Sequence, residues 1–190
     1  MDDHVHDQTL SGCKTGRLNT VSGLGHLAPG FAAKSVSPKV PLWVFLIAGE
    51  TNDLLYFLFS SAGIEPKAAI AVMDFNQGVK YLTPVSNPWS HGFFMSMIWA
   101  MVAAAIAFLF YRDRRTSSVI GLVVFSHWIL DFLMHSNLPL FFDGSPQVGL
   151  GLENSGTGFL FMTGLDLLLL AAGIAIYFRA RKRTTQETRA

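Results

Sequence analysis

The sequence predicts an all-α integral membrane protein, a helical bundle with four long transmembrane helices and a short N-terminal helix. Of the 190 residues, 51% are hydrophobic and only 14% are charged, and the mean hydropathy is +0.38. Long apolar segments follow one another along the chain, and a bilayer span needs about 20 apolar residues. A few ionisable residues interrupt these segments. Because such groups are costly inside a bilayer, they normally face the protein interior and serve a function.

The chain ends are polar. We expect a mobile polar tail over residues 1–18, a single transmembrane helical domain over 19–178 and a basic tail over 179–190. The first 20 residues contain no apolar stretch typical of a secretory signal. Cys13 is the only cysteine, which excludes an internal disulfide and a cysteine-based zinc site. The net charge of +1 gives no reason to expect a nucleic-acid partner.

The apolar segments differ in length. The first, 20–35, is too short to cross a bilayer alone. It predicts a short helix, interfacial or partly inserted, that Pro29 bends or breaks. A connection of mixed polarity over 64–90 separates the first two long segments. We predict spans at 41–63, 91–111, 117–141 and 157–178.

Two basic clusters, Arg112–Arg115 and Arg179–Arg183, orient the predicted bundle. The positive-inside rule places both in the cytoplasm, as expected for a multi-pass protein of the inner (plasma) membrane with a cytoplasmic C-terminus. The first span then runs outward, with Lys34 and Lys39 on the cytoplasmic side. The N-terminal tail is cytoplasmic if 20–35 is interfacial, and outside if that segment dips through the bilayer.

Ionisable residues recur at every fourth position in the third span, at His127, Asp131 and His135. Each such step turns a helix by about 40° and rises about 6 Å, so the three share one face. His127 and Asp131 can therefore hold one ion together. His135 lies about 12 Å from His127 along the axis and suits a second ligand site, a proton donor or a substrate contact. The alternative for His127 and Asp131 is a hydrogen-bonded pair that joins helices.

Further candidates lie in the other spans. Glu50 and Asp53 are three residues apart and share a helix face. Carboxylates beside histidines suit a divalent cation such as zinc, manganese or iron, and without one they would repel or become protonated. Asp53 and Asp131 lie about halfway along their spans, and His91 starts its span at the outer end. The predicted cluster is therefore in the outer half of the membrane. Structural roles remain the alternative for these residues, and a helix–helix hydrogen bond is the main expectation for Asp166.

Several candidates sit in short motifs: Gly25-His26-Leu27, Asn52-Asp53-Leu54, Trp89-Ser90-His91-Gly92 and Ser126-His127-Trp128-Ile129-Leu130-Asp131. Over about residues 20–178 their order resembles the membrane-bound metal-dependent hydrolase family, the YdjM-like proteins. The His-x3-Asp element after a serine is the most specific of these motifs. The segment Val148–Asn154 also looks like a loop found in a branch of such proteins.

The resemblance implies a helical fold akin to zinc-dependent phospholipase C and related nucleases. It also brings His26 to the cluster, which favours a dipping N-terminal helix. The family's acidic motif is often Pro-Asp-x-Asp, whereas this chain has Glu50-Thr51-Asn52-Asp53, so Glu50 would have to replace one aspartate. The implied metal ion, zinc first with manganese or iron as alternatives, would be held by His26, Asp53, His91, His127 and Asp131.

The leading functional hypothesis is a metal-dependent hydrolase that acts on a lipid-like phosphoester or another amphipathic substrate. We expect membrane lipid to surround the protein. A metal-activated water would attack, and Glu50 and His135 are the candidates for proton transfer. A second hypothesis is an ion or proton pathway, for which so small a bundle would have to form a homo-oligomer. A third is a non-catalytic membrane subunit in which the metal joins helices.

Overall fold

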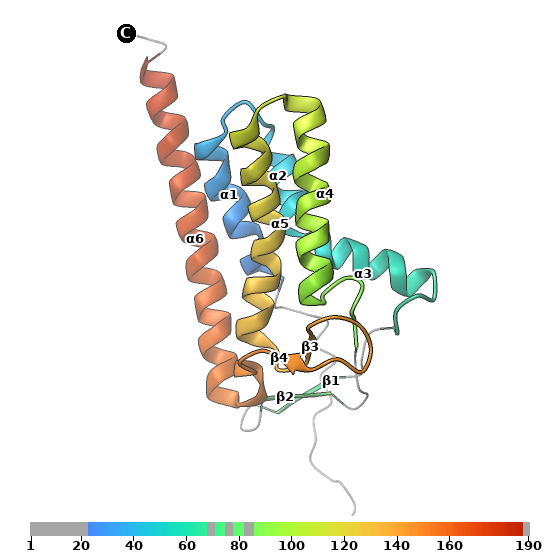
Figure 1. Ribbon diagram of the computed structural model, residues 1–190. Helices are drawn as coiled ribbons and strands as arrows, with labels where there is room; N and C mark the ends of the chain where they lie inside the picture. The colour runs from blue at the N-terminus through green and yellow to red at the C-terminus, as the bar shows by residue number, and fades with distance from the viewer. Residues whose placement is uncertain (1–22, 68–70, 75–77, 82–85, 188–190) are drawn as a thin grey trace, which may run out of the picture.

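The computed structural model describes residues 23–67, 71–74, 78–81 and 86–187, and these are mostly helical (Figure 1). A 3-10 turn, η1, leads into the first of six helices, and a second turn, η2 (Leu152–Asn154), precedes the last. The bounds are η1 Leu24–His26, α1 Leu27–Val36, α2 Leu42–Gly49, α3 Thr51–Ser61, α4 Phe93–Tyr111, α5 Arg114–Met134 and α6 Gly156–Glu187.

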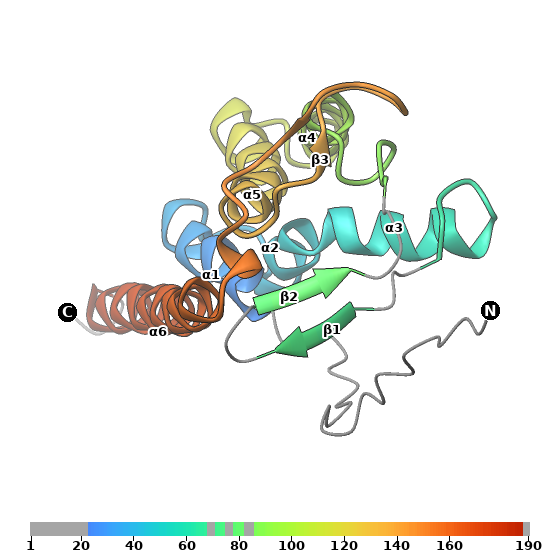
Figure 2. The same cartoon turned by 90° about the horizontal axis from the view of Figure 1, so that it is seen from below.

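Two short antiparallel hairpins complete the described part of the chain. The first pairs β1 (Ala71–Asp74) with β2 (Gly78–Tyr81), within the connection of mixed polarity over 64–90. The second pairs β3 (Leu138–Pro139) with β4 (Gln147–Val148) just after α5. Seen from below, β1 and β2 lie across one end of the bundle, where β2 contacts α6 and η2 (Figure 2).

The all-α class is confirmed, and three described helices, α4, α5 and α6, are long and apolar enough to cross a membrane. A fourth span exists only if α2 and α3 count as one, and these are bent by 58° at Gly49–Thr51. The continuous helix expected over 41–63 is therefore broken. The break lies next to the polar residues of this segment. Asn52 is fully buried and donates to Ser96 of α4, and α3 then leaves the bundle (Figure 1).

Other boundaries also differ from the predicted ones. The third span ends at Met134 instead of continuing to 141, because the chain turns into β3 at Leu138. Pro29 neither bends nor breaks α1, since it lies in the first helical turn, where a missing backbone N–H costs little. The last helix continues through the basic residues 179–183 to Glu187. The expected tail over 1–18 lies outside the described residues.

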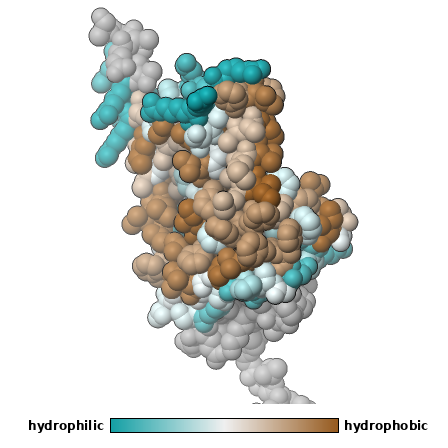
Figure 3. Space-filling view, viewed as in Figure 1, coloured by the Kyte–Doolittle hydropathy of each residue, from teal (hydrophilic) through white to brown (hydrophobic). Residues whose placement is uncertain are grey.

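One end of the bundle carries Arg112, Arg114 and Arg115, and we call it the Arg end; in Figure 3 hydrophilic residues gather there above an apolar belt. The turn between α1 and α2 packs at the same end, where the hydroxyl of Ser37 lies 3.4 Å from Oγ1 of Thr116 on α5 and donates to it. Asp113 caps the start of α5: its carboxylate accepts from the hydroxyl and amide of Thr116, which lowers the pKa of Asp113 below its ordinary value.

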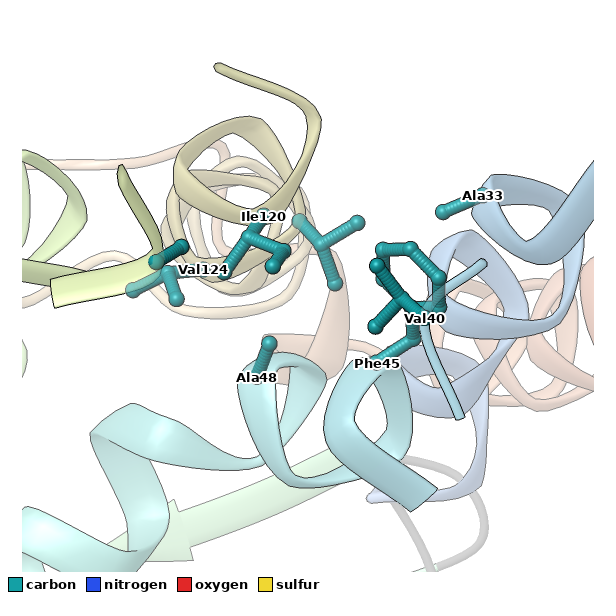
Figure 4. Packing of buried hydrophobic residues seen from close by; sticks show 8 residues of the cluster. Ala33, Val40, Phe45, Ala48, Ile120 and Val124 are labelled. Atoms are coloured by element: carbon teal, nitrogen blue, oxygen red, sulfur yellow. The ribbon is translucent and has the colours of Figure 1, made fainter. Parts of the chain in front are cut away.

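The apolar core lies between the Arg end and the opposite end. Val40 and Phe45 of the α1–α2 hairpin are fully buried against Val124 of α5. Figure 4 shows these side chains meeting between the helices, together with Ala33, Ala48 and Ile120. The core ends where Gly49 and His127 begin the polar cluster, so we call the opposite end the site end.

Candidate metal centre

The residues predicted to hold a metal come together at the site end, although they arise from four separate segments. His127 and Asp131 lie on α5, His26 ends η1, Asp53 lies in the first turn of α3, and His91 precedes α4. The side chains of His127 and Asp131 are 0% and 5% exposed. Asp53 is 47% exposed, so the cluster opens to the surroundings on the α3 side.

Asp131 is at the centre of the cluster. Its Oδ2 lies 3.4 Å from Nε2 of His127 and 3.6 Å from Nε2 of His91, and its Oδ1 lies 3.4 Å from Nε2 of His26. Asp53 Oδ1 lies 3.2 Å from His91 Nε2 and 3.7 Å from His127 Nε2. All of these separations exceed the length of a good hydrogen bond, about 2.9 Å. They match the spacing of about 3.3 Å between ligand atoms on a tetrahedral ion with bonds of about 2.0–2.1 Å.

The hydrogen bond of His127 fixes which of its nitrogens faces the cluster. Nδ1 lies 2.7 Å from the carbonyl oxygen of Gly49, which only accepts, so Nδ1 carries the proton. In the neutral ring Nε2 then presents a lone pair. Among the described residues, neither this buried nitrogen nor the buried Oδ2 of Asp131 has a hydrogen-bond partner. Two buried acceptors thus face each other, and a shared cation would satisfy both.

Close backbone approaches position η1 against its neighbours. A Cβ at position 49 would lie 2.5 Å from the carbonyl oxygen of His26, so only glycine lets α2 end this near η1. A Cβ at position 25 would meet the Oδ1 of Asp166, which is buried on α6. Asp166 thus packs behind His26, and the glycines on both sides allow the imidazole of His26 to stack on His127, with ring centroids 3.8 Å apart.

The two predicted catalytic residues flank the cluster. His135 caps the end of α5; its Nδ1 lies 2.6 Å from Glu153 Oε1 and its Nε2 lies 3.8 Å from Asp131 Oδ1. Glu50 sits at the bend between α2 and α3, and its buried Oε1 has no hydrogen-bond partner among the described residues.

Three overlapping groups of these residues could hold a metal ion, each with ligand atoms within 4.8 Å of one another. The groups are His26, His127 and Asp131; Asp53, His91 and His127; and His26, Glu50 and Asp53. The sequence did not single out three further residues that contact the site. Ser90 hydrogen-bonds His91 and Glu65, and Glu153 hydrogen-bonds His135. Glu65 lies in a polar loop without periodicity, and Glu153 lies in the segment Val148–Asn154, which was noted only as a whole. Ser90 was visible only as a neighbour of His91.

Comparison with known proteins does not assign the chain to a family. No family model, no curated protein and no solved structure matches the chain.

Proposed function

We propose that this protein is a membrane-embedded, metal-dependent hydrolase. The observation that carries the proposal is the pair of buried acceptors His127 Nε2 and Asp131 Oδ2. They lie 3.4 Å apart, and neither has a hydrogen-bond partner among the described residues. Zinc suits this mixed set of imidazole and carboxylate ligands, with manganese or iron as alternatives. The resemblance of the His26, Asp53, His91 and His127–Asp131 motifs to YdjM-like hydrolases points the same way.

His26, Asp53, His91, His127 and Asp131 would hold the ion. When bound, a divalent cation lowers the pKa of a coordinated water and polarises a phosphoryl or carbonyl oxygen. Glu50, whose buried Oε1 has no hydrogen-bond partner in the part of the chain that the structure describes, would accept the proton released from that water. His135, oriented by Glu153 through Nδ1, would supply a proton to the leaving group.

The surroundings of the site favour an amphipathic substrate. Asp53 is the most exposed of the proposed ligands, and it lies on the same helix as the exposed apolar residues Leu54, Phe57 and Leu58. Residues 53 and 57 are one helical turn apart and share a face. A lipid-like phosphoester could place its apolar part on α3 and its polar group at Asp53.

The packing between the two ends favours hydrolysis over ion conduction. Val40, Phe45 and Val124 are fully buried and fill the bundle between the cluster and the Arg end. A conducting protein would need polar groups or water along that length. We therefore place the site on one side of the membrane, in its outer half, with the Arg end and the C-terminus in the cytoplasm.

The test is elemental analysis of the purified protein together with a screen of phosphoesters in mixed micelles. We expect bound metal in the wild type, none in His127→Ala or Asp131→Ala, and an unchanged content in the control Asp143→Ala, which alters an exposed loop carboxylate. Glu50→Gln should keep the metal but hydrolyse about 10²–10⁴-fold more slowly. Metal-free wild-type protein would contradict the proposal, and metal without hydrolysis of any ester would favour a structural role.

A further inference from the structure

Glu65 is a buried carboxylate that the proposed chemistry does not use. It follows α3 in the chain, yet it is only 4% exposed, because the turn before α4 covers it. Its Oε1 accepts from the backbone amides of Trp89 at 2.8 Å and Ser90 at 2.9 Å. Its Oε2 accepts from the hydroxyl of Ser90 at 2.7 Å.

These contacts determine the direction of the next hydrogen bond. A serine hydroxyl has a single proton, and Ser90 donates it to Glu65, since a carboxylate only accepts. Ser90 Oγ is also 2.8 Å from Nδ1 of His91, and in this contact it can only accept. Nδ1 of His91 therefore carries a proton. In the neutral ring Nε2 is then bare and faces the carboxylates of the cluster, 3.2 Å from Asp53 Oδ1 and 3.6 Å from Asp131 Oδ2.

We propose that Glu65, acting through Ser90, is a positioning residue that holds His91 as the Nδ1–H tautomer and directs Nε2 at the metal. Histidine ligands generally donate their other N–H to a carboxylate or carbonyl, and this second bond orients the ring and raises its basicity. The carbonyl of Gly49 does the same for His127. The role of Glu65 in metal binding rests on the proposed function. The Nδ1–H tautomer of His91, in contrast, is expected in the metal-free protein as well.

Glu65→Gln is the most informative variant, because it keeps the shape of the side chain and reverses the hydrogen bond between residue 65 and the Ser90 hydroxyl. The amide oxygen of the glutamine would take the two backbone donors, and its NH2 group would then face Ser90 Oγ. Ser90 would accept from that group and donate to His91 Nδ1, which places the ring proton on Nε2. Zinc affinity should fall about 10–100-fold. Ser90→Ala breaks the link and should leave His91 in a mixture of both tautomers, with a similar loss of affinity.

The matched control is Ser117→Ala. Ser117 is also a buried serine, but it lies at the Arg end of α5, where its hydroxyl donates to the backbone carbonyl of Asp113. It should leave both the tautomer of His91 and the zinc affinity as in the wild type.

The measurement is 15N NMR of histidine-labelled, metal-free protein in detergent, with the His91 signals assigned by His91→Gln, followed by zinc titration. A proton on Nδ1 in the wild type and on Nε2 in Glu65→Gln supports the inference. A proton that stays on Nδ1 in both Glu65→Gln and Ser90→Ala, with unchanged zinc affinity, overturns it. A tautomer switch in protein that binds no zinc would support the positioning role and refute the proposed function.

Discussion

Gly49 serves the cluster through its carbonyl and through its missing side chain. The carbonyl accepts from His127 Nδ1 at 2.7 Å, and the absence of a Cβ lets α2 end against the backbone of His26. A single position thus sets the tautomer of one proposed ligand and the location of another. The sequence Ile47-Ala48-Gly49-Glu50 does not predict either contact of Gly49, because His26 and His127 are distant in the sequence.

At the residue scale we therefore predict that Gly49→Ala disturbs the site. The added methyl would have to push η1 away, which we expect to destabilise the protein by about 1–3 kcal/mol and to lower zinc affinity. The control is Gly164→Ala on α6, where a Cβ meets nothing within 4 Å and should be neutral or stabilise by up to about 1 kcal/mol. Denaturant unfolding and zinc titration check both variants; equal behaviour of the two would contradict the close-packing argument.

Single residues also show which parts of the site could be predicted from the sequence. His127 and Asp131 could be recognised from their spacing alone, because four residues place them on one helix face and their type is unusual in an apolar segment. The depth of His91 at the outer end of its span predicted its place near them, whereas the convergence of His26 was expected only through the family resemblance. Glu65 could not be found, since a carboxylate in a polar loop looks solvated until the fold buries it. Glu153 could not be linked to His135, because 18 residues separate the two in the sequence.

At the scale of elements, α3 departs most from expectation. The 23 residues of 41–63 are apolar enough for one span, yet α2 and α3 meet at 58°. Glu50, Asn52 and Asp53 were the visible signal, since three polar groups in one stretch need protein partners. The direction of the bend could not be predicted, because it depends on the bond from Asn52 to Ser96 on α4. The exposed face of α3 carries Leu54, Phe57 and Leu58.

Because α3 leaves the bundle at the lower edge of the apolar belt, we expect it to lie in the membrane interface (Figures 1 and 3). In a Cys13→Ser background, a fluorescent label on Phe57→Cys should be quenched best by shallow lipid-borne quenchers. Phe57 is 73% exposed, and Met101, which is 60% exposed near the middle of α4, provides the control. A label on Met101→Cys should respond best to deep quenchers. Equal depth for both positions would show that α3 crosses the bilayer as part of a span.

At the scale of the whole molecule, the fold separates a basic end from the end that carries the candidate metal ligands. The α1–α2 hairpin reaches from His26 to the Arg end and returns to Gly49, so Lys34 and Lys39 lie at the same end of the bundle as Arg114. This is the arrangement expected if that end is cytoplasmic. Since α1 runs from the site end to the Arg end, Gly23 is at the site end. This favours the alternative in which the N-terminal segment dips into the bilayer.

This separation makes the sidedness of the site testable in intact cells. If the Arg end is cytoplasmic, the β3–β4 turn next to the site faces outward. In the Cys13→Ser background, Asp143→Cys in that turn should react with a membrane-impermeant maleimide added to intact cells. Arg114→Cys, an exposed position at the Arg end, should react only after permeabilisation. The reverse pattern would place the cluster on the cytoplasmic side, where it would draw on cytoplasmic metal and inner-leaflet lipids instead of those outside.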